Sequence, residues 1–191
     1  MRSTAASIQR RSEAATAAGH SILCLRNRQR ARRVDSVLLR QMIRWLLTEQ
    51  LRVPDFELCF HLVTAREITR VNESYLRHQG STDVISFDYV DTLRDWPLAH
   101  AKAVAHRRDA NETLCGEIFI SVDDALAQAG QYRTTWQAEL ARYVIHGLLH
   151  LAGYDDTQPS RRRRMKREED RLLRRLAGRF SLRLLARAAA C

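Results

Sequence analysis

The most informative segment of this chain, 191 residues long, reads His146-Gly-Leu-Leu-His150-Leu-Ala-Gly-Tyr-Asp155-Asp156. Two histidines four positions apart on a helix project from the same face, one turn above the other. This spacing lets both imidazoles reach a single divalent cation at about 2.0–2.1 Å. Glycine tolerates the left-handed conformation that ends helices, so Gly153 predicts a turn that brings Asp155 or Asp156 back toward the same ion. Two histidines and a carboxylate, with a fourth position open to water, are typical of a catalytic zinc site.

A second interpretation of the histidines is structural. Apolar residues flank them, so the helix that carries them is predicted to be largely buried: Leu140, Tyr143, Val144, Leu148 and Leu151. A histidine in such a helix often serves the core, hydrogen-bonded to the backbone. The Gly-Tyr-Asp-Asp continuation favours the metal site over this alternative. Gly147 occupies the place of the glutamate in the H-E-x-x-H motif of metalloproteases, which counts against peptide hydrolysis.

Composition predicts one globular domain. The chain is 45% apolar, enough for one substantial core, and no apolar run approaches the 18 residues of a membrane span. The four cysteines have no C-x-x-C spacing, and three of them lie in apolar, strand-like surroundings: Cys24, Cys59 and Cys115. Reduced cysteines behave there as small hydrophobes, so we expect a reducing compartment, the cytoplasm, rather than a disulfide framework.

The net charge of +10 is unevenly distributed along the chain. Residues 1–33 hold 8 basic residues and 1 acidic residue, and residues 161–191 hold 12 and 3. The segment between them, 34–160, holds 12 basic and 18 acidic residues. Arginine-rich ends favour contact with phosphate backbones, although a solvated helix face would have the same composition. The candidate RNA-binding residues form one block: Arg161, Arg162, Arg163, Arg164, Lys166 and Arg167.

The pattern of apolar residues predicts an α+β fold with a four-stranded mixed sheet, about five helices and the metal site on a central helix. Strand-like segments span residues 20–26, 57–63, 83–89 and 116–122. Helices are predicted over 36–49, 65–76, from Asp123 or Asp124 to 131, from Thr134 or Thr135 through both histidines, and from Pro159 onward. We expect residues 1–19 to form a disordered basic tail and residues 20–177 to form the domain, with a long loop over 91–114. Residues 178–191 are expected to form a basic extension.

Two segments together resemble the YbeY endoribonuclease family. The run His146–Asp156 fits ten of the eleven positions of that family's signature, H-G-x-L-H-L-x-G-Y-D-H. The segment Asn72–Phe87 is similar to the family's N-x-x-Y/F … T-D-V-L-S-F, and Gly116-Glu117-Ile118 is similar to the G-D-I strand that follows. The order and spacing match over roughly residues 20–177.

The resemblance implies a small domain that binds one zinc ion per chain and cleaves single-stranded RNA. It implies a role in maturation of the small-subunit ribosomal RNA at its 3′ end and in ribosome quality control, with the ribosome or ribosomal assembly factors as partners. Neither a membrane partner nor DNA specificity is expected. Carried over by position, the metal ligands are His146, His150 and Asp156. Behind them, Asp155 and Glu117 are candidates to orient the histidines, although each has a plainer role, Asp155 in the turn and Glu117 at a sheet edge or cap.

Two positions depart from the family pattern. Asp156 stands where the third histidine usually stands, and a carboxylate also binds zinc at about 2.0–2.2 Å. The family's functional arginine directly follows the Tyr/Phe of the second segment, but Leu76 occupies that position and Arg77 comes one residue later. Arg77 is the candidate catalytic residue that clamps the phosphate.

Two other functions remain open at this point. One is a metal-stabilised RNA- or ribosome-binding factor with little catalytic activity, which both departures favour. A structural zinc site usually closes with four protein ligands, often cysteines, and no cysteine lies near the motif. The other is a hydrolase for a different substrate, which would leave the arginine-rich ends unexplained.

Overall fold

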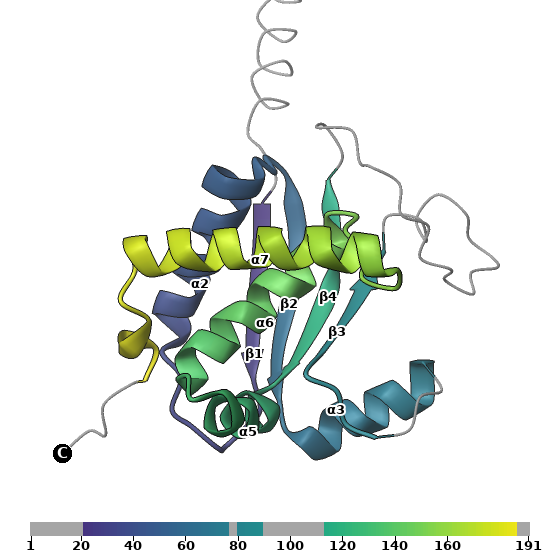
Figure 1. Ribbon diagram of the computed structural model, residues 1–191, viewed down its shortest axis with the longest axis vertical. Helices are drawn as coiled ribbons and strands as arrows, with labels where there is room; N and C mark the ends of the chain where they lie inside the picture. The colour runs from purple at the N-terminus through teal and green to yellow at the C-terminus, as the bar shows by residue number, and fades with distance from the viewer. Residues whose placement is uncertain (1–20, 77–79, 90–112, 187–191) are drawn as a thin grey trace, which may run out of the picture.

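The computed structural model describes residues 21–76, 80–89 and 113–186. Four strands form its one sheet: β1 (Ser21–Asn27), β2 (Phe56–Val63), β3 (Val84–Asp88) and β4 (Leu114–Ser121). They lie in the order β1-β2-β4-β3 (Figure 1). Strands β1, β2 and β4 are parallel, whereas β3 runs antiparallel beside β4. The predicted four-stranded mixed sheet is therefore confirmed.

Five α-helices accompany the sheet within the described residues, as the apolar spacing predicts. They are α2 (Ser36–Trp45), α3 (Ala65–Val71), α5 (Val122–Tyr132), α6 (Trp136–Leu151) and α7 (Pro159–Arg179). The wider turns Leu46–Leu51 and Asn72–Leu76 prolong α2 and α3, and these turns complete the predicted helices 36–49 and 65–76. A short 3-10 turn, Leu182–Leu185, follows α7. The α+β class is confirmed.

Side-chain caps fix where most of these helices begin. The Oδ1 atom of Asp35 accepts the first free N–H groups of α2, at 3.0 and 2.9 Å, and Thr135 caps α6 in the same way. Helix α5 differs from the prediction by one residue, because Ser121 accepts the N–H of Asp124 at 3.2 Å and the helix starts at Val122. The carboxylate of Asp123, the predicted start, instead accepts the N–H of Ala65 at 2.7 Å and joins α5 to α3.

The two faces of the sheet carry different cores because side chains alternate along each strand. One face bears large residues that pack under α2, α6 and α7: Phe56, Leu58, Phe60, Leu62, Leu114, Ile118 and Ile120. The opposite face holds a smaller cluster in which Ile68 of α3 packs with Val63 and Ile85. Figure 1 shows α6 crossing the first face and α7 crossing α6 on its outer side. The histidine-bearing helix thus lies between the sheet and α7.

Helix α6 approaches the sheet closely at Gly147. A β-carbon placed on this glycine would lie 2.7 Å from Cγ2 of Ile118 in β4 and 3.2 Å from Oγ of Ser86 in β3. Both distances are shorter than ordinary contacts of a β-carbon. The absence of a side chain at Gly147 therefore lets the helix pack closely against the strands. This close contact fixes the height of the flanking histidines above the sheet.

The described fold continues through residues 178–186. Leu185 is buried in the main core, and Ala186 forms a β-bridge with Val34. The predicted tail 1–19 lies outside the described residues, as does almost all of the predicted loop 91–114. No helix in the described part of the chain is both long enough and apolar enough to cross a membrane.

Candidate metal centre

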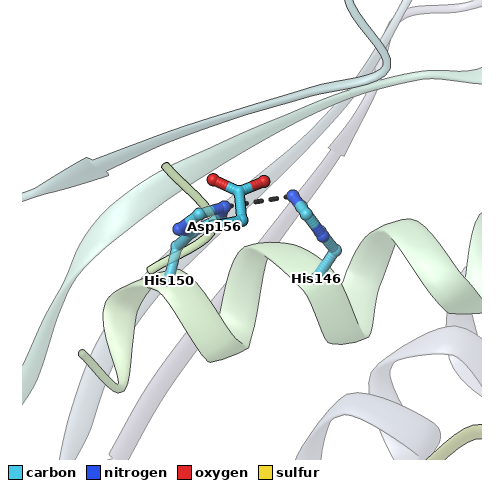
Figure 2. Close-up of side chains that lie close together, drawn as sticks. All are labelled: His146, His150 and Asp156. Carbon is cyan, nitrogen blue, oxygen red and sulfur yellow. Dashed lines mark hydrogen bonds between the residues drawn. The ribbon is translucent and has the colours of Figure 1, made fainter. Parts of the chain in front are cut away.

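Helix α6 presents His146 and His150 on one face, one turn apart, as the spacing predicts. Their Nε2 atoms point toward each other and lie 3.0 Å apart (Figure 2). The rings meet nearly edge to face, with their centroids 4.6 Å apart. Both imidazoles are partly buried, and they direct the same ring nitrogen into the space between them.

A tight turn after α6 brings Asp156 to the histidines. Gly153 adopts a positive φ of 84°, the left-handed conformation that the sequence predicts there. Its N–H donates to the carbonyl of His150 at 2.9 Å, so the chain reverses at once. One ligand atom from each of His146, His150 and Asp156 then lies within 4.8 Å of the other two (Figure 2). Of the two candidate carboxylates, Asp156 is the one that reaches the histidines.

The second nitrogen of each ring has its own acceptor. His146 directs Nδ1 at the carboxylate Oε2 of Glu169 in α7, 3.2 Å away, and His150 directs Nδ1 at the carbonyl oxygen of Tyr154, also 3.2 Å away. Because both partners can only accept, each neutral ring carries its proton on Nδ1 and its lone pair on Nε2. Two lone pairs that face each other at 3.0 Å repel unless a cation lies between them. The donor set therefore fits a divalent metal held by two nitrogens and a carboxylate oxygen.

Glu169 anchors this arrangement from α7. It is buried, and its Oε1 atom accepts from Arg142 of α6 at 2.5 Å and from Lys166 at 3.0 Å. Burial alone would raise the pKa of Glu169, but the hydrogen bonds from His146, Arg142 and Lys166 outweigh it and lower the pKa to about 2. The carboxylate is thus ionised at neutral pH and ready to accept the imidazole proton.

Burial also acts on the ligand histidine nearer the turn. Burial, together with the neighbouring imidazole of His146, lowers the pKa of His150 from its usual value. A lowered pKa keeps the ring neutral at physiological pH, and the neutral form is the one that binds metals.

Asp155 fixes the turn and does not reach the histidine N–H groups. Its carboxylate accepts the N–H and the hydroxyl of Thr157, at 2.8 and 2.9 Å, and a guanidinium N–H of Arg161 at 2.8 Å. The hydrogen bond from the Thr157 backbone and that from Arg161 lower the pKa of Asp155 to about 2. Of its two predicted roles, the structure supports the one in the turn.

Glu117 lies away from the metal centre. Its neighbour Ile118 faces α6 at Gly147, so Glu117 points to the opposite face of the sheet. There its carboxylate lies 3.5 Å from Nε2 of His61. Since β4 is an interior strand, Glu117 is neither an edge residue nor a helix cap, and the structure does not bring it to the ligands. The candidate catalytic residue Arg77 lies outside the described residues.

The predicted arginine block begins beside the metal centre, at the first turns of α7. The guanidinium of Arg161 pairs with Asp155, and that of Arg162 donates to the carbonyl oxygen of Asp156 at 2.9 Å. Arg164 lies over the ring of Tyr154, 5.6 Å from its centroid. Positive charge therefore surrounds the turn that carries Asp156, the third candidate ligand.

The model of one protein family, endoribonuclease YbeY, matches residues 24–177. The chain belongs to the YbeY family. A relative named endoribonuclease YbeY from Salinibacter ruber is 39% identical over 106 residues, which make up 56% of this chain and 61% of the relative. Another YbeY protein, from Alkaliphilus metalliredigens, is 28% identical over 154 residues, 79% of this chain and 92% of the relative. The chain thus spans about three fifths of the first relative's length.

A solved structure has the same fold as this YbeY chain. It is the solution structure of a Thermotoga maritima protein, which superposes with a TM-score of 0.54 and covers 83% of this chain and 91% of its own. The two sequences are 23% identical, so the likeness shows the fold alone.

Sequence reasoning about the YbeY signature missed Glu169. No local pattern marks this residue, because the contact with His146 depends on how α7 crosses α6. The one available signal is indirect: Met165 and Leu172 give α7 an apolar stripe that must face the core, and Glu169 lies between them on that stripe. A carboxylate on a buried stripe requires partners, and these are Arg142, Lys166 and His146.

Proposed function

We propose that this chain is a metal-dependent endoribonuclease that cleaves single-stranded RNA. The observation that carries the proposal is the pair of Nε2 atoms, 3.0 Å apart, with Asp156 beside them. Membership of the YbeY family supports RNA as the substrate, and the arginines that begin α7 supply charge for its phosphates.

Zinc is the metal we propose, with one ion per chain. His146, His150 and Asp156 would hold it, and three protein ligands leave a position for water or substrate, as in catalytic sites. When bound, the ion would supply Lewis acidity toward a phosphoryl oxygen and would activate a water molecule. The additional negative charge of Asp156, compared with a histidine, would weaken that Lewis acidity and favour harder metals.

The chain's own residues would bind and orient the RNA. Arg162 lies next to the carbonyl of Asp156, so its guanidinium is placed to pair with a phosphate near the ligands. The remaining members of the block extend this charge along α7: Arg161, Arg163, Arg164, Lys166 and Arg167. Arg77 remains the proposed phosphate clamp, from the segment that precedes β3.

The biological setting is also a proposal. Family resemblance supports a role in small-subunit ribosomal RNA maturation and ribosome quality control, with ribosomal partners. Cys24 and Cys59 are free thiols, which supports a location in the reducing cytoplasm.

Cleavage of a labelled single-stranded RNA by the purified protein tests the proposal, with His150→Ala prepared in the same way. We expect cleavage that requires a divalent metal and that the variant loses. Equal residual cleavage by both proteins would indicate contamination and reject the enzyme. Tight RNA binding without cleavage would instead favour an RNA- or ribosome-binding factor, the alternative that Asp156 and Leu76 suggest.

A further inference from the structure

A polar cavity of about 400 Å³ lies next to the metal centre, and the proposed function uses only one of its lining residues, Lys166. Residues of α5, α6 and α7, and of the turns that precede β3 and α6, line this cavity: Asp83, Gln128, Tyr132, Thr134, Glu139, Arg142, Tyr143 and Lys166. The α6 residues among them precede His146 by three, four and seven positions, so they share its face of the helix. At 1.5 Å per residue, the cavity begins about 5–10 Å from His146 along the helix axis.

The hydroxyl of Tyr143 gives this cavity a vacant hydrogen-bonding position. The side chain is buried, with 4% of the residue exposed, and its oxygen has no hydrogen-bond partner among the described residues. Burial, and then the nearby carboxylate of Asp83, raise the pKa of Tyr143, so the group remains a neutral phenol that can donate and accept. Buried hydroxyls are nearly always paired, and an unpaired one at a cavity wall indicates a missing partner.

Two carboxylates among the lining residues, Asp83 and Glu139, each keep an oxygen available. Asp83 uses Oδ1 to accept the N–H of Val84 at 3.0 Å, and Glu139 uses Oε1 to accept the hydroxyl of Thr134 at 2.5 Å. Within the described residues, neither second oxygen accepts a hydrogen bond, although Oε2 of Glu139 lies 3.8 Å from a nitrogen of Arg142. The wall therefore presents acceptors to whatever fills the cavity.

The end of the cavity toward the metal centre carries two cations and the carboxylates that pair with them. Arg142 and Lys166 both donate to Glu169, which in turn contacts His146, and Arg142 also pairs with Asp170 at 2.8 Å. A strand whose phosphate lies at the metal centre would pass these two cations as its next base enters the cavity. Lys166 is exposed and keeps ammonium N–H groups for a further acceptor, so a nucleotide fits with its phosphate toward Lys166 and its base toward the carboxylate oxygens.

Among the four RNA bases, guanine has the edge that suits an acceptor wall. Its Watson–Crick edge carries N1–H and the N2 amino group side by side, and a carboxylate can accept from both at once. Proteins read unpaired RNA bases through such edges, often in pockets beside the backbone contacts. Adenine, cytosine and uracil each offer fewer adjacent donors to the same wall.

We propose that this cavity binds the base of the nucleotide next to the cleaved bond and selects guanine. The binding surface is formed by Asp83, Glu139 and the hydroxyl of Tyr143. The position of this base next to the cleaved bond rests on the proposed function. Binding of the base itself does not require cleavage.

Binding of the four nucleoside 5′-monophosphates to the full-length, chelator-treated protein tests base selection directly. Titration by calorimetry or NMR should show GMP binding at least about tenfold tighter than AMP, CMP or UMP. Tyr143→Phe and Asp83→Asn should each reduce that preference severalfold. Tyr75→Phe, on the opposite face of the sheet against Phe87, should leave it unchanged. Because the Tyr143 hydroxyl has no hydrogen-bond partner among the described residues, its removal should not lower the thermal stability.

The outcomes separate base selection from the enzyme itself. Equal binding of the four monophosphates, or equal preference in Tyr143→Phe and Tyr75→Phe, would overturn the inference even if the protein cleaves RNA. Selective GMP binding by a protein that cleaves nothing would reject the proposed function and keep the guanine site. If both activities are present, RNAs with a single guanine at successive positions should be cut at a fixed offset from it. Cleavage positions that do not depend on the position of the guanine would overturn the proposed position of the base next to the cleaved bond.

Discussion

The Nδ1 atom of His146 lies 3.2 Å from the Oε2 atom of Glu169, so two separate helices meet directly behind a metal ligand. A carboxylate in this position fixes the tautomer and the orientation of the ring and raises the basicity of the ligating nitrogen. Arg142 and Lys166 hold the carboxylate ionised and in place. The position of α7 is therefore part of the metal centre, although α7 supplies no ligand.

Replacing Glu169 should weaken metal binding without abolishing it. We expect Glu169→Gln to lose roughly 10- to 100-fold in zinc affinity, because the amide neither carries the negative charge nor compels the Nδ1 tautomer. Competition with a chromophoric chelator measures the affinity, and cobalt absorption reports the geometry. Glu168→Gln is the matched control, since Glu168 pairs with Arg171 instead. Equal zinc affinity in the two variants would show that the carboxylate contact has no influence on the ligand.

The proposed third ligand, Asp156, should set the choice of metal and the pH dependence of the proposed RNA cleavage. In Asp156→His a neutral imidazole replaces a carboxylate, so the bound metal keeps more of its charge and acidifies its water more strongly. We expect the pH–activity profile to move to lower pH and the preference to move from manganese toward zinc. Zinc affinity and RNA cleavage indistinguishable from those of the unchanged protein would contradict this account of Asp156.

The boundaries of the helices and the histidine pair could be predicted because their signals are local. Asp35, Thr135 and Pro159 act within one helical turn of themselves, and the four-residue spacing of the histidines needs only a helix. The choice between Asp155 and Asp156 needed the turn geometry, although position in the family pattern already favoured Asp156. Local signals thus defined the two candidate histidine ligands, whereas the third candidate came from the family pattern.

Partners from other elements could not be predicted in the same way. Glu169 is 23 residues from His146, and only the crossing of α7 over α6 joins them. Glu117 illustrates the converse case, because it stands in the matching family segment yet faces the other side of the sheet. Neighbouring residues of a strand face opposite sides of the sheet. Because Ile118 of β4 packs against α6, the adjacent Glu117 faces the other side, and the sequence alone does not show which of the two faces α6.

The close approach of α6 to the sheet predicts an asymmetry between two helical glycines. Gly147→Ala should destabilise the fold by about 1–3 kcal/mol, since the new methyl group would crowd the buried side chain of Ile118. Gly178→Ala, in α7, should stabilise it by about 0.5–1 kcal/mol, because nothing lies within 4 Å of the added carbon. Urea unfolding of both variants measures the difference, and similar effects at the two sites would show that α6 can move away from β4.

Arginines at the two ends of α7 should contribute differently to RNA binding. Arg163 and Arg167 are exposed, lie one turn apart near the metal centre, and can be replaced without disturbing the turn held by Arg161. If both contact phosphates, Arg163→Gln with Arg167→Gln should lower the slope of log affinity against log salt by about 0.7 for each lost contact. Arg174→Gln with Arg175→Gln, at the other end of the helix, is the control with the same change in charge. Equal slopes in the two double variants would place the RNA elsewhere.

His61 should make the fold less stable in weak acid. Its ring is 3% exposed, stacks on Phe119 with centroids 4.3 Å apart, and forms no hydrogen bond among the described residues. Burial lowers the pKa of His61, and the nearby carboxylate of Glu117 opposes that effect only in part. The unfolded chain therefore takes up a proton below its ordinary pKa of about 6.5, whereas the folded protein does not.

The sign of this difference gives a measurable consequence. Stability is fully present above pH 6.5 and falls as the pH drops below that value, because the unfolded state then binds more protons than the folded state. His61→Phe keeps a ring against Phe119 but cannot titrate, so its melting temperature should fall less than that of the unchanged protein between pH 7.5 and 5.5. Chelator in both samples removes metal effects, and the ligand histidines titrate equally in both proteins. Parallel curves would mean that His61 accepts its proton in the folded state, with Glu117 as the compensating charge.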